Sequence, residues 1–122
     1  MAPGKRILVV EDDPLLRWAV VETLRAERHR VDEAADAASA IRILTADPAF
    51  DRILLDLFLP DCTGLDCLAR LHALAPTATI TLMTAHATPE RLAAASQLGA
   101  SGVLNKPFDM HTLSSVVAPT VH

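Results

Sequence analysis

Short apolar runs alternate with longer amphipathic segments along the chain. The runs occur at Ile7–Val10, Val31–Ala35, Ile53–Leu55, Thr79–Met83 and Val103–Leu104. Because they are continuous rather than alternating, they favour strands that are covered on both faces, as in a parallel sheet. The run from Val31 contains an Asp and a Glu and is the weakest of these strand predictions.

Helix signals separate and follow these runs. Asp13-Pro14 and Thr88-Pro89 each place a capping side chain ahead of a proline at the first helical position. Asp36 and Asp109 can cap two further helices, and Gly99 stands where a left-handed C-terminal cap would fall. The helical apolar faces are Leu16, Val20 and Leu24; Ala40, Ile41 and Leu44; Leu65, Leu68 and Ala69; and Leu113, Val116 and Val117, with Pro119 ending the last helix.

Five strands alternating with five helices predict a (βα)5 chain, and therefore an α/β sandwich with a mostly parallel sheet. A length of 122 residues fits one domain, which we expect to cover residues 1–122 with a core of about 5–118. Aromatic residues make up only 3% of the chain, so we expect the core to be built from Leu, Val, Ile and Ala.

Charge and composition argue against several classes of function. The formal net charge is −4 and the basic residues are scattered, which argues against direct binding of nucleic acid. No apolar run approaches the roughly 20 residues that a membrane-spanning helix needs, and the first residues do not form a signal peptide. We therefore expect a cytoplasmic protein. Cys62 and Cys67 lack Cys-x-x-Cys spacing, and we interpret them as free thiols in a reducing cytoplasm.

Polar residues directly follow four of the apolar runs. They are Glu11-Asp12-Asp13, Asp56, Thr84 and Lys106. Because the carboxyl ends of parallel strands share one edge of a sheet, we expect these side chains to converge. Carboxylates so close together need a proton or a cation, and an all-oxygen set favours Mg²⁺ or Mn²⁺ over zinc. A neighbouring Lys and Thr suit a phosphoryl group, and a metal-bound Asp is a plausible nucleophile.

Each of these polar residues also has an ordinary structural explanation, since a charged side chain after a strand is often only a solvated turn or a helix cap. We interpret Asp13 as the N-cap of the first helix rather than as a site residue. Asp61 and Asp66 are interpreted as loop and helix-surface residues, and we assign no functional role to either.

Taken together, the motifs resemble the receiver domains of two-component response regulators. The matching stretches are Ile7–Asp13, Leu54–Pro60 with Gly64, Leu82–Ala85 and Gly99–Phe108. They span almost the whole chain, and their joint spacing is specific although any one motif alone would be weak. The resemblance implies a flavodoxin-like three-layer sandwich with strand order 2-1-3-4-5, and a cis Lys106-Pro107 peptide bond.

The resemblance implies that Asp56 is the residue that accepts a phosphoryl group. It also implies a Mg²⁺ (or Mn²⁺) site in which Asp12 and Asp56 bind the ion directly. Glu11 would act through water, and the backbone carbonyl of Phe58 would add a ligand. Such a chain is a signalling domain that assists its own phosphorylation and dephosphorylation, rather than an enzyme.

The same resemblance implies a switch. Thr84 would hydrogen-bond the phosphoryl group, Lys106 would pair with it, and Ala85 would be small enough to let it enter. A sensor histidine kinase or a small phosphodonor would supply the phosphoryl group. The new charge would then change the face formed by the fourth helix, fifth strand and fifth helix, which could form a homodimer. Val103 departs from the family, because many receivers carry an aromatic switch residue there.

Phe58, His86 and Trp18 bear on the lifetime of the phosphoryl group and on the subclass of receiver. Phe58 and His86 flank the site at variable positions, and our hypothesis is that bulky Phe58 hinders water from attacking the acyl phosphate. The stretch Asp12–Trp18 resembles receivers attached to transcription activators of the nitrogen-regulation class, although a Trp here is also expected as an ordinary helix residue.

The sequence can be compared with what three rival interpretations require. An FMN-binding flavodoxin would need a Ser/Thr/Gly-rich phosphate loop after the first strand, where Glu11-Asp12-Asp13 stands. A phosphatase of the haloacid dehalogenase class would need its nucleophile directly after the first strand and a second Asp two residues later. A degenerate receiver that only binds partners is the more serious rival, but the core site residues are present. The chain is expected to be a fragment of a longer regulator, with a stand-alone receiver as the alternative.

Overall fold

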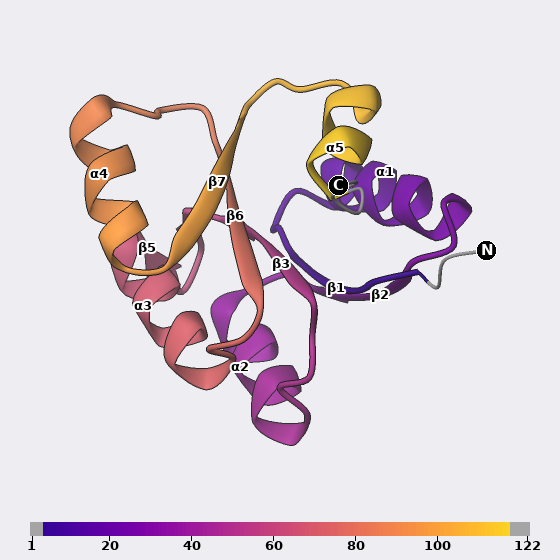
Figure 1. Cartoon of the computed structure of the whole chain (residues 1–122), viewed down its shortest axis with the longest axis horizontal. Coiled ribbons are helices and arrows are strands. Elements are labelled where there is room, and N and C mark those ends of the chain that lie inside the picture. Colours follow the sequence, from indigo (N-terminus) through magenta and orange to yellow (C-terminus); the bar gives the residue numbers. More distant parts are fainter. Residues whose placement is uncertain (1–3, 118–122) are drawn as a thin grey trace, which may run out of the picture.

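A five-stranded parallel sheet lies at the centre of the computed structural model, which describes residues 4–117 (Figure 1). Its order is β2-β1-β3-β6-β7, and every ladder is parallel. The strands are β1 (Arg6–Val10), β2 (Arg30–Ala34), β3 (Arg52–Asp56), β6 (Thr79–Thr84) and β7 (Ala100–Asn105). The predicted fold class and strand order are therefore confirmed, including the weak strand at Val31.

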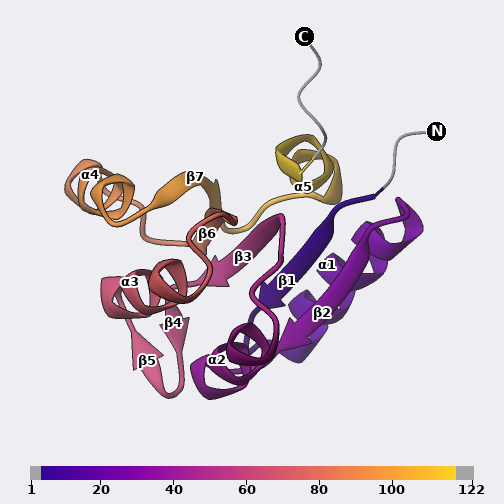
Figure 2. The same cartoon turned by 60° about the horizontal axis from the view of Figure 1, so that its bottom comes forward.

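Helices cover both faces of this sheet, which makes the three layers (Figures 1 and 2). They are α1 (Pro14–Ala26), α2 (Ala37–Ala46), α3 (Leu65–Leu74), α4 (Pro89–Gln97) and α5 (Met110–Val117). Helices α1 and α5 lie side by side on one face, while α2, α3 and α4 cover the other. No helix in the described part of the chain is long and apolar enough to cross a membrane.

The continuous apolar runs are explained by a separate core on each face of the sheet. Along β1, Leu8 and Val10 belong to the core under α2 and α3, whereas Ile7 and Val9 belong to the core under α1 and α5. All of these side chains are fully buried. Successive strand residues point to opposite faces, so a strand covered on both faces must be apolar at every position.

Most of the predicted helix signals have the expected geometry. The Asp13 carboxylate accepts hydrogen bonds from the backbone N–H groups of the first turn of α1. Thr88, Asp36 and Asp109 cap α4, α2 and α5 in the same way. Gly99 has a φ of +110°, which confirms the positive-φ residue expected after α4. Pro119 lies outside the described residues.

A short antiparallel hairpin, which the sequence analysis did not predict, connects β3 to α3. It consists of β4 (Phe58–Leu59) and β5 (Cys62–Thr63). The hairpin brings Cys62 beside the first turn of α3, and a disulfide joins it to Cys67, with the two Cα atoms 5.9 Å apart. The prediction of free thiols is therefore wrong. The unpredicted hairpin turn places the two residues within disulfide reach.

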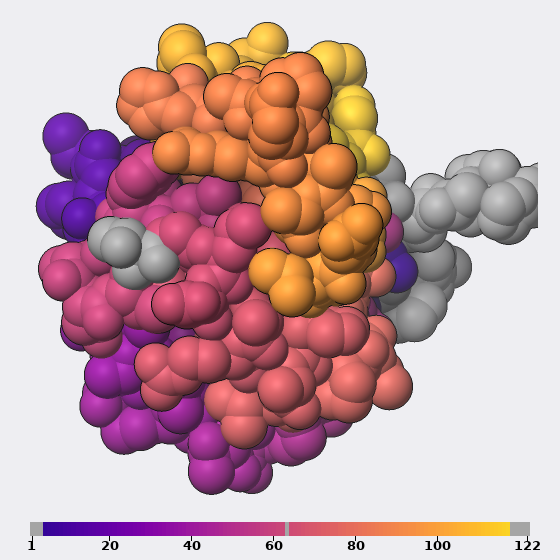
Figure 3. Space-filling model, turned by 90° about the vertical axis from the view of Figure 1, so that its left-hand side faces the viewer, coloured from indigo at the N-terminus to yellow at the C-terminus, as the bar shows by residue number. Residues whose placement is uncertain are grey.

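Seen from the side of α4, the molecule presents α4 (orange) next to the segment that holds the hairpin and α3 (magenta to rose) (Figure 3).

Trp18 lies on α1 and is 65% exposed, so it is a surface residue rather than part of the core.

Candidate functional site

Carboxylates from the ends of β1 and β3 converge at the carboxyl edge of the sheet. One oxygen each of Glu11, Asp12 and Asp56 can be chosen so that all lie within 4.8 Å of one another. Glu11 and Asp56 are buried, whereas Asp12 is exposed. The structure thus brings together the acidic residues singled out in the sequence, and the cluster has one side open to solvent.

The environment of Glu11 disfavours its negative charge. Burial raises the pKa of Glu11 from 4.5 to about 7, against the opposing effect of the hydrogen bond from Lys106. Its Oε2 also accepts the backbone N–H of Asp13 at 3.1 Å. The main chain is fixed on both sides, since the Glu11 N–H donates to Ala34 and its carbonyl accepts from the Arg17 guanidinium.

Lys106 is the cation of the site, brought in from the end of β7. Its Nζ lies 2.6 Å from Glu11 Oε1 and 3.5 Å from Asp56 Oδ2. Burial alone would lower the pKa of Lys106, but the hydrogen bond and charge of Glu11 and the charge of Asp56 outweigh it, so the pKa is raised. The peptide bond to Pro107 is cis, as the resemblance implied, and the Lys106 N–H donates to the Thr84 carbonyl at 2.8 Å.

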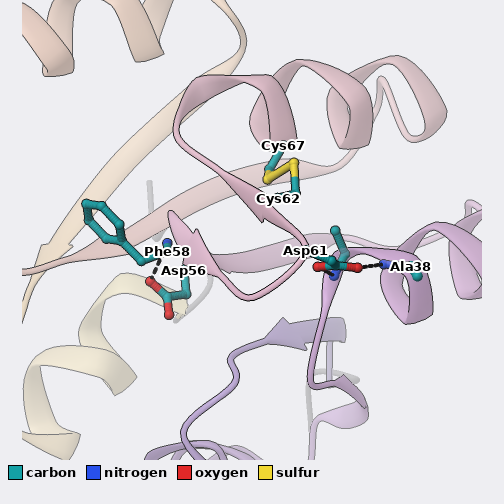
Figure 4. Close-up of a disulfide and its surroundings, with 7 residues drawn as sticks. Ala38, Asp56, Phe58, Asp61, Cys62 and Cys67 are labelled. Atoms are coloured by element: carbon teal, nitrogen blue, oxygen red, sulfur yellow. Dashed lines mark hydrogen bonds between the residues drawn. A yellow bond between two sulfur atoms is a disulfide. The ribbon is translucent and has the colours of Figure 1, made fainter.

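The start of the hairpin holds one side of the Asp56 carboxylate. Asp56 Oδ1 accepts the backbone N–H of Phe58 at 3.0 Å (Figure 4). The Phe58 ring is 44% exposed and meets the His86 ring edge-on, with centroids 5.8 Å apart. The Arg91 guanidinium lies 5.9 Å from the centre of the same ring. The aromatic side chains at the two variable positions therefore contact each other beside Asp56.

Thr84 is buried at the end of β6, and its Oγ1 accepts the His86 N–H at 3.1 Å. The next residue, Ala85, is exposed and lines a hollow of about 340 Å³ together with Lys106 and Leu16. The hollow therefore lies beside the cation of the site, and the three acids of the cluster are not among the residues that line it. Val103 is half-buried in β7 and lines a separate hollow of about 320 Å³ beside α4.

Asp61 has a structural role that the sequence did not predict. The Asp61 carboxylate at the turn of the hairpin accepts the backbone N–H groups of Ala37 and Ala38, at 2.8 and 2.9 Å. These two hydrogen bonds lower the pKa of Asp61 and fasten the hairpin to the N-terminus of α2. Only the spatial approach of two distant segments creates this cap, so no local sequence signal pointed to it. Asp66, on the surface of α3, is exposed as expected.

The donor set of the acidic cluster suits a hard divalent cation. All three side chains offer carboxylate oxygens, and the described cluster contains no His or Cys. Mg²⁺ prefers such oxygen ligands and is commonly held by one or two carboxylates with water completing its shell. The pKa of Glu11 is raised mainly because its carboxyl group is buried, and the nearby charge of Asp56 adds to this effect.

Comparison with known proteins identifies the family of the chain. The family described as the response regulator receiver domain matches residues 7–118. The DNA-binding transcriptional regulator NtrC of Azospirillum brasilense is 35% identical over 111 residues, which are 91% of this chain and 23% of that protein. Sporulation initiation phosphotransferase F of Bacillus subtilis is 27% identical and is matched over 93% of this chain and 91% of its own length.

Solved structures give the same result. A CheY-like response regulator receiver domain protein from Methanospirillum hungatei superimposes with a TM-score of 0.87 at 28% identity, covering 93% of this chain and 90% of the other. The chain spans between 23% and 50% of the length of several curated transcriptional regulators and response regulators that it matches. The match over nearly the whole chain establishes that it belongs to the response regulator receiver domain family.

Proposed function

We propose that this chain accepts a phosphoryl group on Asp56 from a sensor histidine kinase, in a Mg²⁺-dependent transfer. The observation that carries the proposal is the position of Lys106, whose Nζ lies 3.5 Å from one oxygen of Asp56 and 2.6 Å from Glu11. A buried acid with a cation on one side and an acidic cluster on the other is suited to a nucleophile that receives a dianionic group.

As the family resemblance implies, the ion would be held by Asp12 and Asp56 directly, by Glu11 through water, and by the carbonyl of Phe58. The three carboxylates lie close enough together to share an ion. When bound, Mg²⁺ supplies positive charge that offsets the negative charge of the carboxylates and the incoming phosphoryl oxygens. The chain's own residues provide the rest of the site. Burial of Asp56 excludes bulk water from its carboxylate, and the Phe58 N–H fixes the rotation of that carboxylate.

In the transfer, an Asp56 carboxylate oxygen forms a bond to phosphorus while the bond from phosphorus to the donor nitrogen breaks. The electron pair of that bond returns to the imidazole of the kinase, which takes up a proton. Lys106 pairs with a phosphoryl oxygen, and the small side chain of Ala85 leaves space for the group. The chain itself remains a signalling domain that assists its own phosphorylation.

The phosphoryl group would draw the Thr84 hydroxyl inward, away from the His86 N–H that it now accepts. Because Thr84 ends β6, next to β7, this movement biases the face made of α4, β7 and α5. We propose that this face then controls an output or forms a homodimer, with Val103 taking what remains of the switch role. The receiver would work in the cytoplasm as one domain over residues 1–122, without contacting nucleic acid itself.

The proposal is tested by intact mass spectrometry after incubation with acetyl phosphate, with and without Mg²⁺. The wild-type chain should gain one phosphoryl group only when Mg²⁺ is present, and Asp56→Asn should gain none. Asp66→Asn, which removes an exposed acid on α3, serves as the matched control and should behave as wild type. A folded wild-type chain that gains no phosphoryl group beside a working control receiver would refute the proposal and favour a receiver that only binds partners.

A further inference from the structure

The Cys62–Cys67 disulfide lies in the segment that leads from the acceptor residue to α3 (Figure 4). That segment is the β4–β5 hairpin, residues 58–63, which begins two residues after Asp56. The first residue of the hairpin is Phe58, whose N–H fixes Asp56 and whose carbonyl is the proposed metal ligand. Any change in the order of the hairpin therefore acts on both the acceptor and the metal site.

Contacts with three parts of the chain hold this hairpin in the described structure. At its base, the Gly64 N–H donates to the Leu57 carbonyl at 2.8 Å. At its turn, the Asp61 carboxylate binds the first N–H groups of α2. On its returning strand, the disulfide joins Cys62 to Cys67 in α3. The last attachment is the only covalent one of the three and can be removed by a change in redox state.

We propose that Cys62 and Cys67 form a reversible thiol-redox site that controls phosphoryl transfer at Asp56. This inference rests on the proposed function, because the process that it regulates is the phosphorylation of Asp56. Disulfides in cytosolic proteins of mesophiles are generally transient and serve catalysis or redox sensing rather than structure. A receiver that works in the cytoplasm and carries a disulfide beside its acceptor fits the sensing class.

The two sulfurs differ in how well a reductant can reach them. Cys62 is partly buried at the edge of the hairpin, whereas Cys67 is only 1% exposed within α3. A thiolate of a low-molecular-weight dithiol attacks Cys62 Sγ, the Cys62–Cys67 bond breaks, and Cys67 leaves as a thiolate that takes up a proton. The second thiolate of the dithiol then attacks the mixed disulfide and releases Cys62, so two electrons pass from the dithiol to the protein.

Reduction leaves the hairpin held by hydrogen bonds at its base and its turn and by the buried side chain of Leu59. The Phe58 N–H and carbonyl are then less firmly placed, which weakens the hold on Asp56 and on the metal ion. Small displacements of the groups in a site steeply reduce the rate of the reaction that takes place there. We therefore expect phosphorylation by acetyl phosphate to slow by about threefold to tenfold on reduction. The disulfide form is thus the more responsive of the two.

The test begins with the redox site itself. Alkylation and intact mass measured before and after dithiothreitol should show no free thiols and then two, while residues 57–64 lose protection in hydrogen exchange. A chain in which these cysteines are alkylated without prior reduction, or in which exchange of residues 57–64 does not change on reduction, would overturn the proposal.

The second step measures Mg²⁺-dependent phosphorylation of the oxidised and reduced wild-type chain and of the double variant Cys62→Ser with Cys67→Ser. The variant should match the reduced wild type and should not respond to dithiothreitol. Equal rates for oxidised and reduced wild type would overturn the coupling, and this comparison needs no variant to fold. If none of the forms is phosphorylated, the proposed function fails, and the exchange measurement alone decides whether the redox site exists.

Discussion

The burial of Glu11 leads to a prediction about stability in the absence of divalent cations. The folded-state pKa of about 7 lies above the ordinary value of 4.5, so between these two pH values the folded state binds more protons than the unfolded state. Stability must therefore fall as the pH rises through this window. Replacement of Glu11 by Gln keeps an acceptor for Lys106 but removes the charge, and it should remove this part of the pH dependence.

The size of the effect follows from the same shift. At about 1.4 kcal/mol per pKa unit, the rise in the Glu11 pKa corresponds to an upper limit of about 3 kcal/mol. Between pH 5 and pH 8 the contribution of Glu11 alone should lower the free energy of unfolding by about 2–3 kcal/mol. This is a large part of the stability of a domain of this size.

The assay is urea unfolding followed by circular dichroism, in EDTA, at several pH values from 5 to 8. The stability difference between Glu11→Gln and wild type should grow in favour of the variant as the pH rises, because the other titrating groups are common to both. Glu22→Gln, an exposed change on α1, should run parallel to wild type. A difference between Glu11→Gln and wild type that stays constant over this range would refute the inference that burial raises the pKa of Glu11.

Further predictions concern the hairpin, the turn after α4 and the lifetime of the phosphoryl group. Asp61→Ala should speed hydrogen exchange at Ala37 and Ala38 by about tenfold or more because it removes their acceptor, whereas Glu22→Ala should not. Gly99→Ala should cost about 2 kcal/mol in urea unfolding, because φ is +110° and a Cβ would lie 2.6 Å from the His72 ring. Gly102→Ala, whose Cβ would meet its nearest neighbour at 3.9 Å, should be tolerated, and equal costs would contradict this reading. Phe58→Asn should speed loss of the phosphoryl group several-fold if the ring shields the acyl phosphate from water, and an unchanged half-life measured by mass spectrometry would end that hypothesis.

The central strands β1, β3 and β6 could be predicted because they are covered on both faces and buried along almost their whole length. Ile7 to Val10 are buried without exception, and such a run leaves a clear trace in the sequence. The caps at Asp13, Asp36, Thr88 and Asp109 were equally readable, since each acts on backbone groups two or three residues away. Local physical chemistry therefore accounts for the order of elements and for most of their boundaries.

Features that depend on the approach of separate segments could not be predicted. The role of Asp61 needs α2 to lie beside the hairpin, and the disulfide needs the hairpin to turn Cys62 toward α3. The prediction of free thiols relied on spacing and on an assumed compartment, neither of which describes where the chain turns. The raised pKa of Glu11 likewise depends on burial that the sequence does not state.

The acidic cluster could be predicted because parallel strands end at one edge. Asp56 and Thr84 end neighbouring strands of the sheet, and Lys106 directly follows the next strand, so positions fifty residues apart meet. Topology alone does not predict which of the two acids, Glu11 or Asp56, lies closer to Lys106. Lys106 lies closer to Glu11 than to Asp56 in this structure.

The central claim, that Asp56 carries the phosphoryl group, is tested most directly by trapping the acyl phosphate with borohydride. The reagent reduces an aspartyl phosphate to homoserine, and peptide sequencing by mass spectrometry then locates the changed residue. After treatment with acetyl phosphate and Mg²⁺, we expect homoserine at position 56 and at no other aspartate. Homoserine at Asp12 or at another acid, or an unmodified position 56 in a chain that has gained a phosphoryl group, would contradict it.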